Sequence, residues 1–406
     1  MGEDAVGFAR AETFSGDLSN LWRLDVMPPL RRLSWWWWWW LIVLPDAENP
    51  KRSRQLMILW STKDADHVRV NEHDWRPDGR FHIDAEGGHT LPGMVCAWWY
   101  DGDVMHEPYV MREARIAAFD RNHPLWTGKR DFEGAGAVIP LTEDDLSMGL
   151  SEDGSHFWLR CTGDAEAVAA GAPTHFDLRI TPALEPTSRA AYSNNKFVGG
   201  MGYDIIRLHA CETAGKVGED DVSGTAYFQK VTVQAPSVPW FWGFLHFDDG
   251  SYLDWFVPHA SFSMTARDAR AWKLRDVVRA PLRGSGLLHD AARGRSETFN
   301  RCEVEVLPPE DGLAGGEPDA HGTALPRFHI RVWNGRTQIG LIVKAASRAH
   351  WCFDQPTRMG LNSHLTYNEY PLEVESITIL DEQGVRTLED WTWVHGNAEH
   401  AWGLLH

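Results

Sequence analysis

The sequence predicts an all-β protein built from antiparallel strands, and two observations lead to this prediction. Short segments in which apolar and polar residues alternate follow one another along most of the chain, as in RFHIRVW, TQIGLIVKA and LEVESITILDE. Tight-turn signals fall between such segments, for example NGR at 334–336 and DEQG at 381–384. Many short strands joined by tight turns are typical of sandwiches and barrels. Helical periodicity is found only over 265–280, where we expect a helix.

Two domains are expected, because 406 residues exceed the length of one ordinary domain. The stretch TVQAPSVPW places two prolines between two strong strand signals near Pro236. We therefore predict an N-terminal domain over 1–235 and a C-terminal domain over 236–406. The loop-like stretch over 308–326 is predicted to be a surface insertion in the second domain.

Composition argues against several classes of function. The net charge of −18 disfavours nucleic acid as a partner, because its phosphates would be repelled. The five cysteines are scattered without a CxxC pair, and no segment has metal-ligand spacing, so we expect reduced thiols and no metal. Motifs for nucleotide cofactors and for a serine nucleophile are also lacking in the sequence, so no cofactor is expected.

The first residues lack the basic and apolar regions of a secretory signal, which predicts a cytoplasmic location. The apolar run from Trp35 to Leu44 has ten residues, whereas a spanning helix needs about 20. Excess acid with few lysines is what a salt-adapted cytoplasm produces, although a GC-rich genome also favours arginine. No oligomeric state is predicted from the sequence.

The run LSWWWWWWLIVL at 33–44 is predicted to be a strand. Side chains alternate between the two faces of a sheet, so Trp35, Trp37 and Trp39 lie on one face and Trp36, Trp38 and Trp40 on the other. One set can fill a barrel interior while the other packs on a neighbouring element. Six indoles, whose N–H groups need partners when buried, suit either a plain core or a cavity for a large apolar ligand.

The segment WFWGFLHFDDGSYLDWFV predicts a hairpin whose two-residue turn is Asp249-Gly250. This register pairs Leu245 with Asp254. The predicted first face carries Trp240, Trp242, Phe244, His246 and Trp255. The predicted second face carries Tyr252 and Asp254.

Asp254, His246 and Glu369 are the candidate catalytic residues. A carboxyl among aromatic rings loses solvation, which raises its pKa and lets Asp254 protonate a carbon–carbon double bond. Indole faces would then stabilise the resulting cation. Two of them also have a purely structural interpretation: Asp254 would hydrogen-bond Tyr252 or a backbone N–H, and His246 would be a satisfied core histidine. In LTYNEYPLEV, Glu369 is expected to enter the core of the second barrel or to cap its mouth.

Three segments resemble one family: SWWWWWWLIVLPDAENPKRSRQLMILWSTKD, RLHACETAGKVGEDDVSGTAYFQKVTVQAPSVPWFWGFLHFDDGSYLDWF and YNEYPLEVE. Together they are similar to the carotenoid 1,2-hydratase group, which comprises hydroxyneurosporene synthase and AttH-like proteins and is related to plant tocopherol cyclases. The resemblance implies two tandem lipocalin-like β-barrels. It also implies cofactor-independent, proton-driven chemistry on isoprenoid-type substrates. Brief contact with a membrane surface, from which the substrate is collected, is a further expectation.

One departure from the family pattern concerns Gln229. After the Gly224-Thr225-Ala226-Tyr227 stretch the family usually places an acid, whereas this chain has Phe228 and Gln229. Glutamine cannot donate a proton to an alkene. Either another acid acts here, or the reaction differs, or this chain only binds its ligand.

Three functions are therefore weighed: an isoprenoid hydratase, cyclase or isomerase, a lipid carrier of the same fold, and a carbohydrate-active β-sandwich. Sugar platforms usually sit on exposed loops near paired carboxylates, whereas these indoles lie inside strands. Tyr203 is expected to line the first barrel. The complete set of predicted ligand-binding residues is Trp37, Trp39, Tyr203, Tyr227, Gln229, Trp240, Trp242, Tyr252 and Trp255.

Overall fold

The structure, a computed structural model, describes residues 21, 24, 30, 33–46, 48–76, 82–118, 138–139, 146–151, 155–182, 191–196, 198–261, 264, 279–307, 324–355 and 363–405. Almost all of its regular structure is antiparallel β-sheet, so the predicted all-β fold class is confirmed. The described helix α1 (Ala165–Ala169) is short. Short 3-10 turns lie at Val198–Gly200, Ala291–Arg293 and Leu388–Asp390.

The first sheet has 12 strands and is built from residues before Pro236. Its strands are β1 (Ser34–Pro45), β2 (Ser53–Lys63), β5 (His82–Ile83), β6 (His89–Tyr100), β7 (Met105–Ala118), β8 (Val138–Ile139), β9 (Leu146–Leu150), β10 (Phe157–Thr162), β11 (His175–Pro182), β12 (Ala191–Lys196), β13 (Gly202–Val217) and β14 (Asp220–Gln234). The order β5-β6-β2-β1-β14-β13-β11-β10-β9-β8 places the tryptophan strand β1 near the centre.

The second sheet has 14 strands. They are β3 (Val68–Val70), β4 (His73–Trp75), β15 (Trp240–Phe247), β16 (Tyr252–Ser261), β17 (Arg279–Pro281), β18 (Ser285–Asp290), β19 (Arg295–Phe299), β20 (Arg301–Leu307), β21 (Arg327–Trp333), β22 (Gln338–Ala345), β23 (Ala349–Gln355), β24 (Ser363–Asp381), β25 (Gly384–Thr387) and β26 (Val394–Leu404). Its main order is β19-β18-β16-β15-β26-β24-β22-β21-β20.

The predicted domain boundary falls between β14 and β15, where the chain passes from one sheet to the other. The hairpin β3–β4 crosses this boundary: it precedes β15 in the sequence, but β3 pairs with β23 of the second sheet. The turns predicted at 334–336 and 381–384 join β21 to β22 and β24 to β25. Apart from its last two residues, which begin β17 with Arg279, the helix predicted over 265–280 lies outside the described residues. Most of the predicted insertion over 308–326 does as well.

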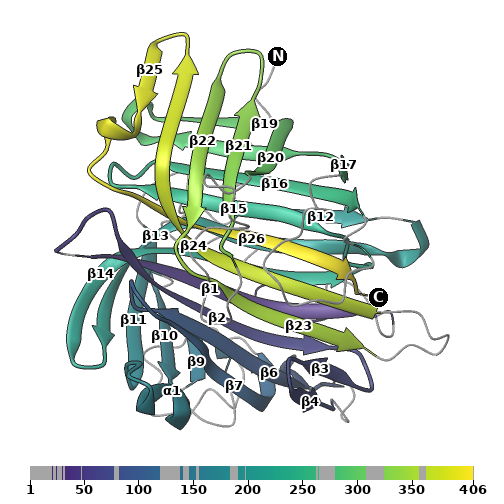
Figure 1. The fold of residues 1–406 in the computed structure, drawn as a ribbon. Helices are drawn as coiled ribbons and strands as arrows, with labels where there is room; N and C mark the ends of the chain where they lie inside the picture. Colours follow the sequence, from purple (N-terminus) through teal and green to yellow (C-terminus); the bar gives the residue numbers. More distant parts are fainter. Residues whose placement is uncertain are drawn as a thin grey trace.

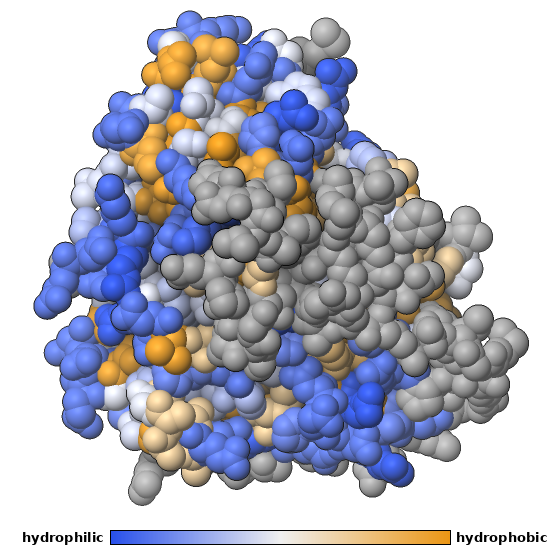
Figure 2. All heavy atoms as spheres, viewed as in Figure 1, coloured by the Kyte–Doolittle hydropathy of each residue, from blue (hydrophilic) through white to orange (hydrophobic). Residues whose placement is uncertain are grey.

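Each sheet curls into a half-barrel around an apolar core, and the two sheets pack against each other (Figure 1). The first core includes Ile42, Ile58 and Leu178, and the second includes Leu253 and Ile330. A third apolar cluster draws its side chains from both sheets and fills the layer between them. We call this the inter-sheet layer. In Figure 2, hydrophilic residues cover much of the described surface, with apolar residues in patches between them.

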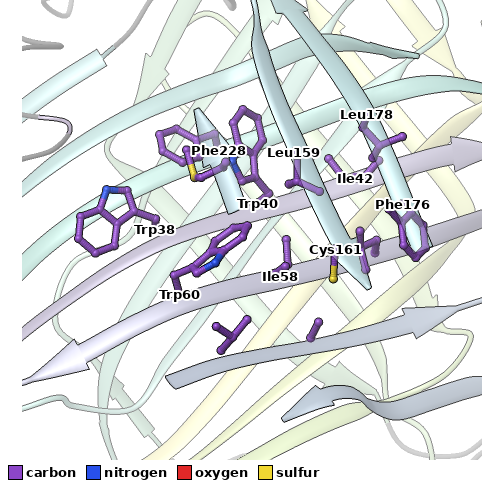
Figure 3. Close-up of a cluster of buried hydrophobic side chains, with 14 of the residues drawn as sticks. Trp38, Trp40, Ile42, Ile58, Trp60, Leu159, Cys161, Phe176, Leu178 and Phe228 are labelled. Carbon is purple, nitrogen blue, oxygen red and sulfur yellow. The ribbon is translucent and has the colours of Figure 1, made fainter. Parts of the chain in front are cut away.

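The tryptophan strand β1 separates the first core from the inter-sheet layer, and the predicted alternation is confirmed. Trp36, Trp38 and Trp40 belong to the first core, whereas Trp39 belongs to the inter-sheet layer. Figure 3 shows Trp38 and Trp40 in that core with Trp60 and Phe228. Their indole N–H groups are satisfied: Trp38 Nε1 donates to the Leu21 carbonyl at 2.7 Å and Trp60 Nε1 to the Leu146 carbonyl at 3.0 Å.

The hairpin β15–β16 differs from the predicted register by one residue. His246 pairs with Tyr252, and Phe244 pairs with Asp254. Asp254 and His246 therefore share one face, which corrects the prediction that they face opposite sides. Trp255 lies on the other face, in the second core, so its predicted place beside Trp242 is wrong.

The turn of this hairpin is the physical reason for the difference. A two-residue type I′ turn needs positive φ at both central positions, but here only Gly250 has it, at 83°. The Phe247 N–H donates to the Ser251 carbonyl and the Gly250 N–H to the Phe247 carbonyl, so three residues form the loop. A one-residue shift in register moves every side chain to the opposite face.

Candidate functional site

Asp254 on β16 is the carboxyl at the centre of the candidate site. Its Oδ2 accepts a hydrogen bond from the Tyr252 hydroxyl and its Oδ1 accepts one from the Leu287 N–H, both at 2.9 Å. The side chain is 17% exposed. Burial raises the pKa of Asp254 to about 6, against the opposing effects of the Tyr252 bond, the Arg207 charge and the Leu287 N–H. A fraction of this carboxyl is therefore protonated at neutral pH, as a general acid requires.

Tyr252 precedes Asp254 by two residues and lies on the same face of β16. It is fully buried. Burial, followed by the neighbouring Asp254 carboxylate, raises its pKa well above the usual range, so its hydroxyl stays protonated and donates to Asp254.

Two neighbours of Asp254 were not predicted from the sequence, His209 and Arg207, both on β13. His209 Nδ1 lies 3.8 Å from Asp254 Oδ2, and its ring centroid is 5.1 Å from that of Tyr252. Burial lowers the pKa of His209 to about 3, so the ring is neutral at physiological pH. A β-bulge between Leu208 and Cys211 interrupts the pairing at His209, and simple alternation does not anticipate such a bulge.

Aromatic rings from both sheets line the neighbourhood of Asp254. The Tyr227 ring on β14 stacks on Phe244 with 5.2 Å between centroids, and lies 5.1 Å from Trp242 and 5.5 Å from Trp39. Gln229 Oε1 accepts a hydrogen bond from the Tyr227 hydroxyl at 3.5 Å. The structure thus brings these predicted ligand-binding residues together, although they come from three strands of two sheets.

His246 bridges the two sheets. Its Nδ1 lies 2.7 Å from Thr225 Oγ1, and its Nε2 lies 2.9 Å from the carbonyl oxygen of His209. Burial lowers the pKa of His246 to about 4, which keeps the ring neutral. Both ring nitrogens are occupied by protein partners, so His246 is placed to hold His209 and its strand, not to exchange a proton with a ligand.

Glu369 on β24 faces the first sheet, which corrects the expectation that it enters the second core or caps a barrel mouth. The Trp98 Nε1 group on β6 donates to its Oε2 at 2.9 Å. The residue opposite Glu369 on β26 is Glu399, which was not predicted from the sequence. Glu399 accepts hydrogen bonds from Trp240 Nε1, at 2.9 Å, and from the Tyr367 hydroxyl. The prediction used only the alternation of side chains within β24, which cannot tell which sheet packs on this face. At Glu369 the neighbour is the first sheet.

The remaining predicted residues lie at the margins of this site. Trp37 is half-buried at the edge of the inter-sheet layer, with its ring 5.7 Å from that of Trp35. Tyr203 is half-buried near the start of β13. Ile206 of the same strand points into the first core, so alternation turns Tyr203 away from it, and its predicted place in the first barrel is wrong.

A cavity of about 340 Å³ lies between strands β6 and β7 of the first sheet and the hairpin β3–β4. Trp75, Met94 and Met111 line it together with acidic residues that include Glu72 and Asp74. None of the predicted site residues contributes to it.

The described part of the chain holds neither a cluster of metal-ligating side chains nor a membrane-spanning helix. No group of three or more His, Cys, Asp or Glu side chains there is arranged to hold a metal ion. No helix among the described residues is long and apolar enough to span a bilayer.

Comparison with known proteins gives matches to solved structures. No protein-family model matches the chain, and no curated protein does. Among solved structures, a protein described as an AttH from Nitrosomonas europaea is 12% identical, covers 91% of this chain and 93% of its own, and has a TM-score of 0.46. Kievitone hydratase from Nectria haematococca is 10% identical, covers 99% of this chain and 95% of its own, and also has a TM-score of 0.46.

Proposed function

We propose that this protein is an enzyme that protonates a carbon–carbon double bond of an isoprenoid or similar polyene lipid without a cofactor. One observation carries the proposal: Asp254, a carboxyl with a pKa raised to about 6, lies among aromatic rings between the two sheets. Such an environment keeps part of the acid protonated and favours an apolar ligand over water. The resemblance of the sequence to the carotenoid 1,2-hydratase group supports the same reaction class.

The reaction begins when protonated Asp254 transfers its proton to one carbon of the double bond, whose π electrons form the new C–H bond. The positive charge then lies on the neighbouring, more substituted carbon. Tyr227, Trp242 and Trp39 present the aromatic surfaces that stabilise this cation, at about 2 kcal/mol per desolvated contact. Addition of water gives hydration, addition of a hydroxyl of the substrate gives cyclisation, and loss of a neighbouring proton gives isomerisation.

Tyr252 has a positioning role in this mechanism. Its hydroxyl donates to Oδ2 of ionised Asp254, which fixes the orientation of the carboxyl group after proton transfer. His209 and Arg207 lie on the opposite sheet and complete the polar surroundings. The acid therefore works only when both sheets are docked.

A carrier without catalysis is the second candidate, and Gln229 favours it. Glutamine occupies the position at which the resembled family usually has an acid, and it cannot protonate an alkene. A carrier would use the same aromatic surfaces for binding alone.

The test combines ligand identification with one matched pair of variants. Organic extraction of the natively purified protein, followed by mass spectrometry, is expected to yield a polyene or prenyl lipid. With such lipids as substrates, Asp254→Asn should abolish turnover and leave ligand affinity within about twofold. The control Asp221→Asn, whose side chain is 88% exposed, should behave like the wild type.

Two outcomes would count against the enzyme. Turnover that persists in Asp254→Asn would remove this residue as the acid. A wild-type protein that binds the lipid without converting it would support the carrier. Residual activity in Gln229→Ala together with none in Asp254→Asn would show that the proton source has moved relative to the resembled family.

A further inference from the structure

Glu369 and Glu399 form a directly opposed pair of carboxyl groups in the inter-sheet layer. They are strand partners on the adjacent antiparallel strands β24 and β26, and their exposed fractions are 1% and 5%. Directly opposed residues have Cβ atoms about 5 Å apart. Two ionised carboxylates at this distance without solvent repel strongly, so one proton is retained between them. The pKa of both groups is raised, first by burial and, for Glu369, also by the neighbouring Glu399 charge.

Hydrogen-bond donors from both sheets converge on this pair. The Trp98 indole of the first sheet donates to Glu369, while the Trp240 indole and the Tyr367 hydroxyl of the second sheet donate to Glu399. These donors stabilise one negative charge and oppose the rise in pKa. The other titratable groups that face the pair are the Cys96 thiol and the Tyr227 phenol, both with pKa values raised by burial and neutral at physiological pH.

One acceptor and one donor beside the pair have no hydrogen bond of good geometry within the described part of the protein. These are Glu369 Oε1 and the indole Nε1 of Trp39, both buried. The Trp39 indole lies close enough to Glu369 to act on it as a hydrogen-bond donor, which lowers the pKa of that carboxyl. Buried polar groups normally have partners, and a small hydroxyl group is able to serve both of these, accepting from the indole and donating to the carboxylate.

The positions of Asp254 and Glu399 suit an acid and a base on opposite sides of one ligand. Asp254 pairs with Phe244, and the next row of the same face pairs Trp242 with Glu399. The two acidic residues are therefore two strands apart across the sheet and one row apart along it, so that their backbones are about 12 Å from each other. Tyr227 of the facing sheet lies near both, because the charge of each carboxylate raises its pKa.

We propose that the Glu369–Glu399 pair is the base of the reaction and that Glu369 Oε1 and Trp39 Nε1 bind the hydroxyl that captures the cation. This inference rests on the proposed function and narrows it to addition of an O–H group, with water as the hydroxyl. The oxygen lone pair forms the C–O bond, the O–H bond breaks, and its proton passes to the ionised carboxylate of the pair. Asp254, which is partly exposed, regains a proton from solvent, and the pair releases one to solvent.

Infrared spectroscopy of the full-length protein tests the shared proton without a substrate. At pH 8 the wild type should show the C=O stretch of a buried protonated carboxyl, and Asp254→Asn should retain it. In Glu369→Gln and in Glu399→Gln, the remaining carboxyl no longer has a charged neighbour. Its band should therefore disappear at a pH at least about one unit lower than in the wild type. The control is Glu373→Gln on the same strand, whose side chain is 50% exposed. Absence of the band in the wild type, or unchanged titration in both variants, would overturn the proposal.

A high-resolution crystal structure tests the hydroxyl site directly. The expected result is a water oxygen within hydrogen-bonding distance of both Trp39 Nε1 and Glu369 Oε1. Direct bonding of the indole to the carboxylate, with no room for an oxygen, would overturn this part of the proposal.

Turnover in D₂O of the lipid that co-purifies, or of geranylgeraniol, separates this proposal from the proposed function. Glu399→Gln should keep deuterium exchange into recovered alkene, because Asp254 still protonates it, and should lose at least tenfold of the addition product. Trp39→Phe should lose the addition product by more than it loses exchange. Asp254→Asn should lose both. Addition that persists in Glu399→Gln would refute only the proposed base and leave the proposed acid in place. Exchange that persists in Asp254→Asn would refute the proposed acid.

Discussion

At the scale of single residues, the main property of the site is a carboxyl whose proton affinity is set by two opposing effects. Burial raises the pKa of Asp254 to about 6, and the hydrogen bond from Tyr252 is the largest of the effects that lower it. Without that bond the acid would hold its proton more tightly and release it less readily. The residue next to the carboxylate therefore tunes the pH range in which Asp254 works.

The pH dependence of turnover should report this tuning. Only protonated Asp254 is active as the acid, so the rate should fall as pH rises above about 6. Tyr252→Phe removes a bond that lowers the pKa of Asp254, so the falling limb should move to higher pH by about 0.5 to 1 unit. Tyr109→Phe is the control, because that hydroxyl donates to the Pro173 carbonyl and belongs to strand β7 of the first sheet. A limb that stays in place or moves to lower pH would contradict this account.

At the scale of elements, the face of β15 that lines the site depends on a glycine in the middle of the strand. Gly243 lies between Trp242 and Phe244, and the Trp255 indole of β16 covers it. A Cβ atom at position 243 would be 2.3 Å from a ring atom of Trp255 and 2.8 Å from the Asn397 carbonyl oxygen. The absence of a side chain lets strand β15 lie close to this indole and fixes the two aromatic residues on either side.

Gly243→Ala should therefore destabilise the protein by about 1 to 3 kcal/mol, because either the indole or the backbone must move. Ligand affinity should fall with it, since Trp242 and Phe244 shift as well. Urea unfolding and ligand titration would measure the two effects. The matched control is Gly340→Ala in strand β22, where an added Cβ meets no atom within 4 Å. Equal stability of the two variants would show that the strand tolerates the change.

At the scale of the whole molecule, the candidate site exists only because the two sheets dock. Gln55 Nε2 of β2 donates to the Gly396 carbonyl of β26 at 2.9 Å, and the hairpin β3–β4 crosses to pair with β23. The inter-sheet layer also buries Asp254, Glu369 and Glu399, whose pKa values are all raised. Burial of these carboxyls favours their protonated forms in the folded state, so function is obtained at the expense of stability at higher pH.

The sign of this effect can be tested on Asp254. The folded pKa is about 6 and the ordinary value is 3.8, so the folded state binds more protons in this window and wild-type stability falls as pH rises through it. Asp254→Asn carries no such group, so its stability relative to the wild type should increase by up to about 3 kcal/mol between pH 4 and pH 8. Thermal unfolding measures this, with Asp221→Asn as the exposed control. A difference that is constant with pH would contradict the raised pKa.

The sequence by itself determined the all-β fold class, the two-faced tryptophan strand and the identity of Asp254 as a buried acid. These follow from side-chain alternation and residue type, which are local properties of an extended chain. Only the tertiary structure decided which groups meet. A three-residue loop ending in Gly250 shifted the hairpin register and put Asp254 on the face of His246, and sheet docking opposed Glu399 to Glu369 and brought His209 to the acid. Such contacts join residues far apart in the chain, and their register depends on backbone conformation at turns and bulges that the alternation pattern does not encode.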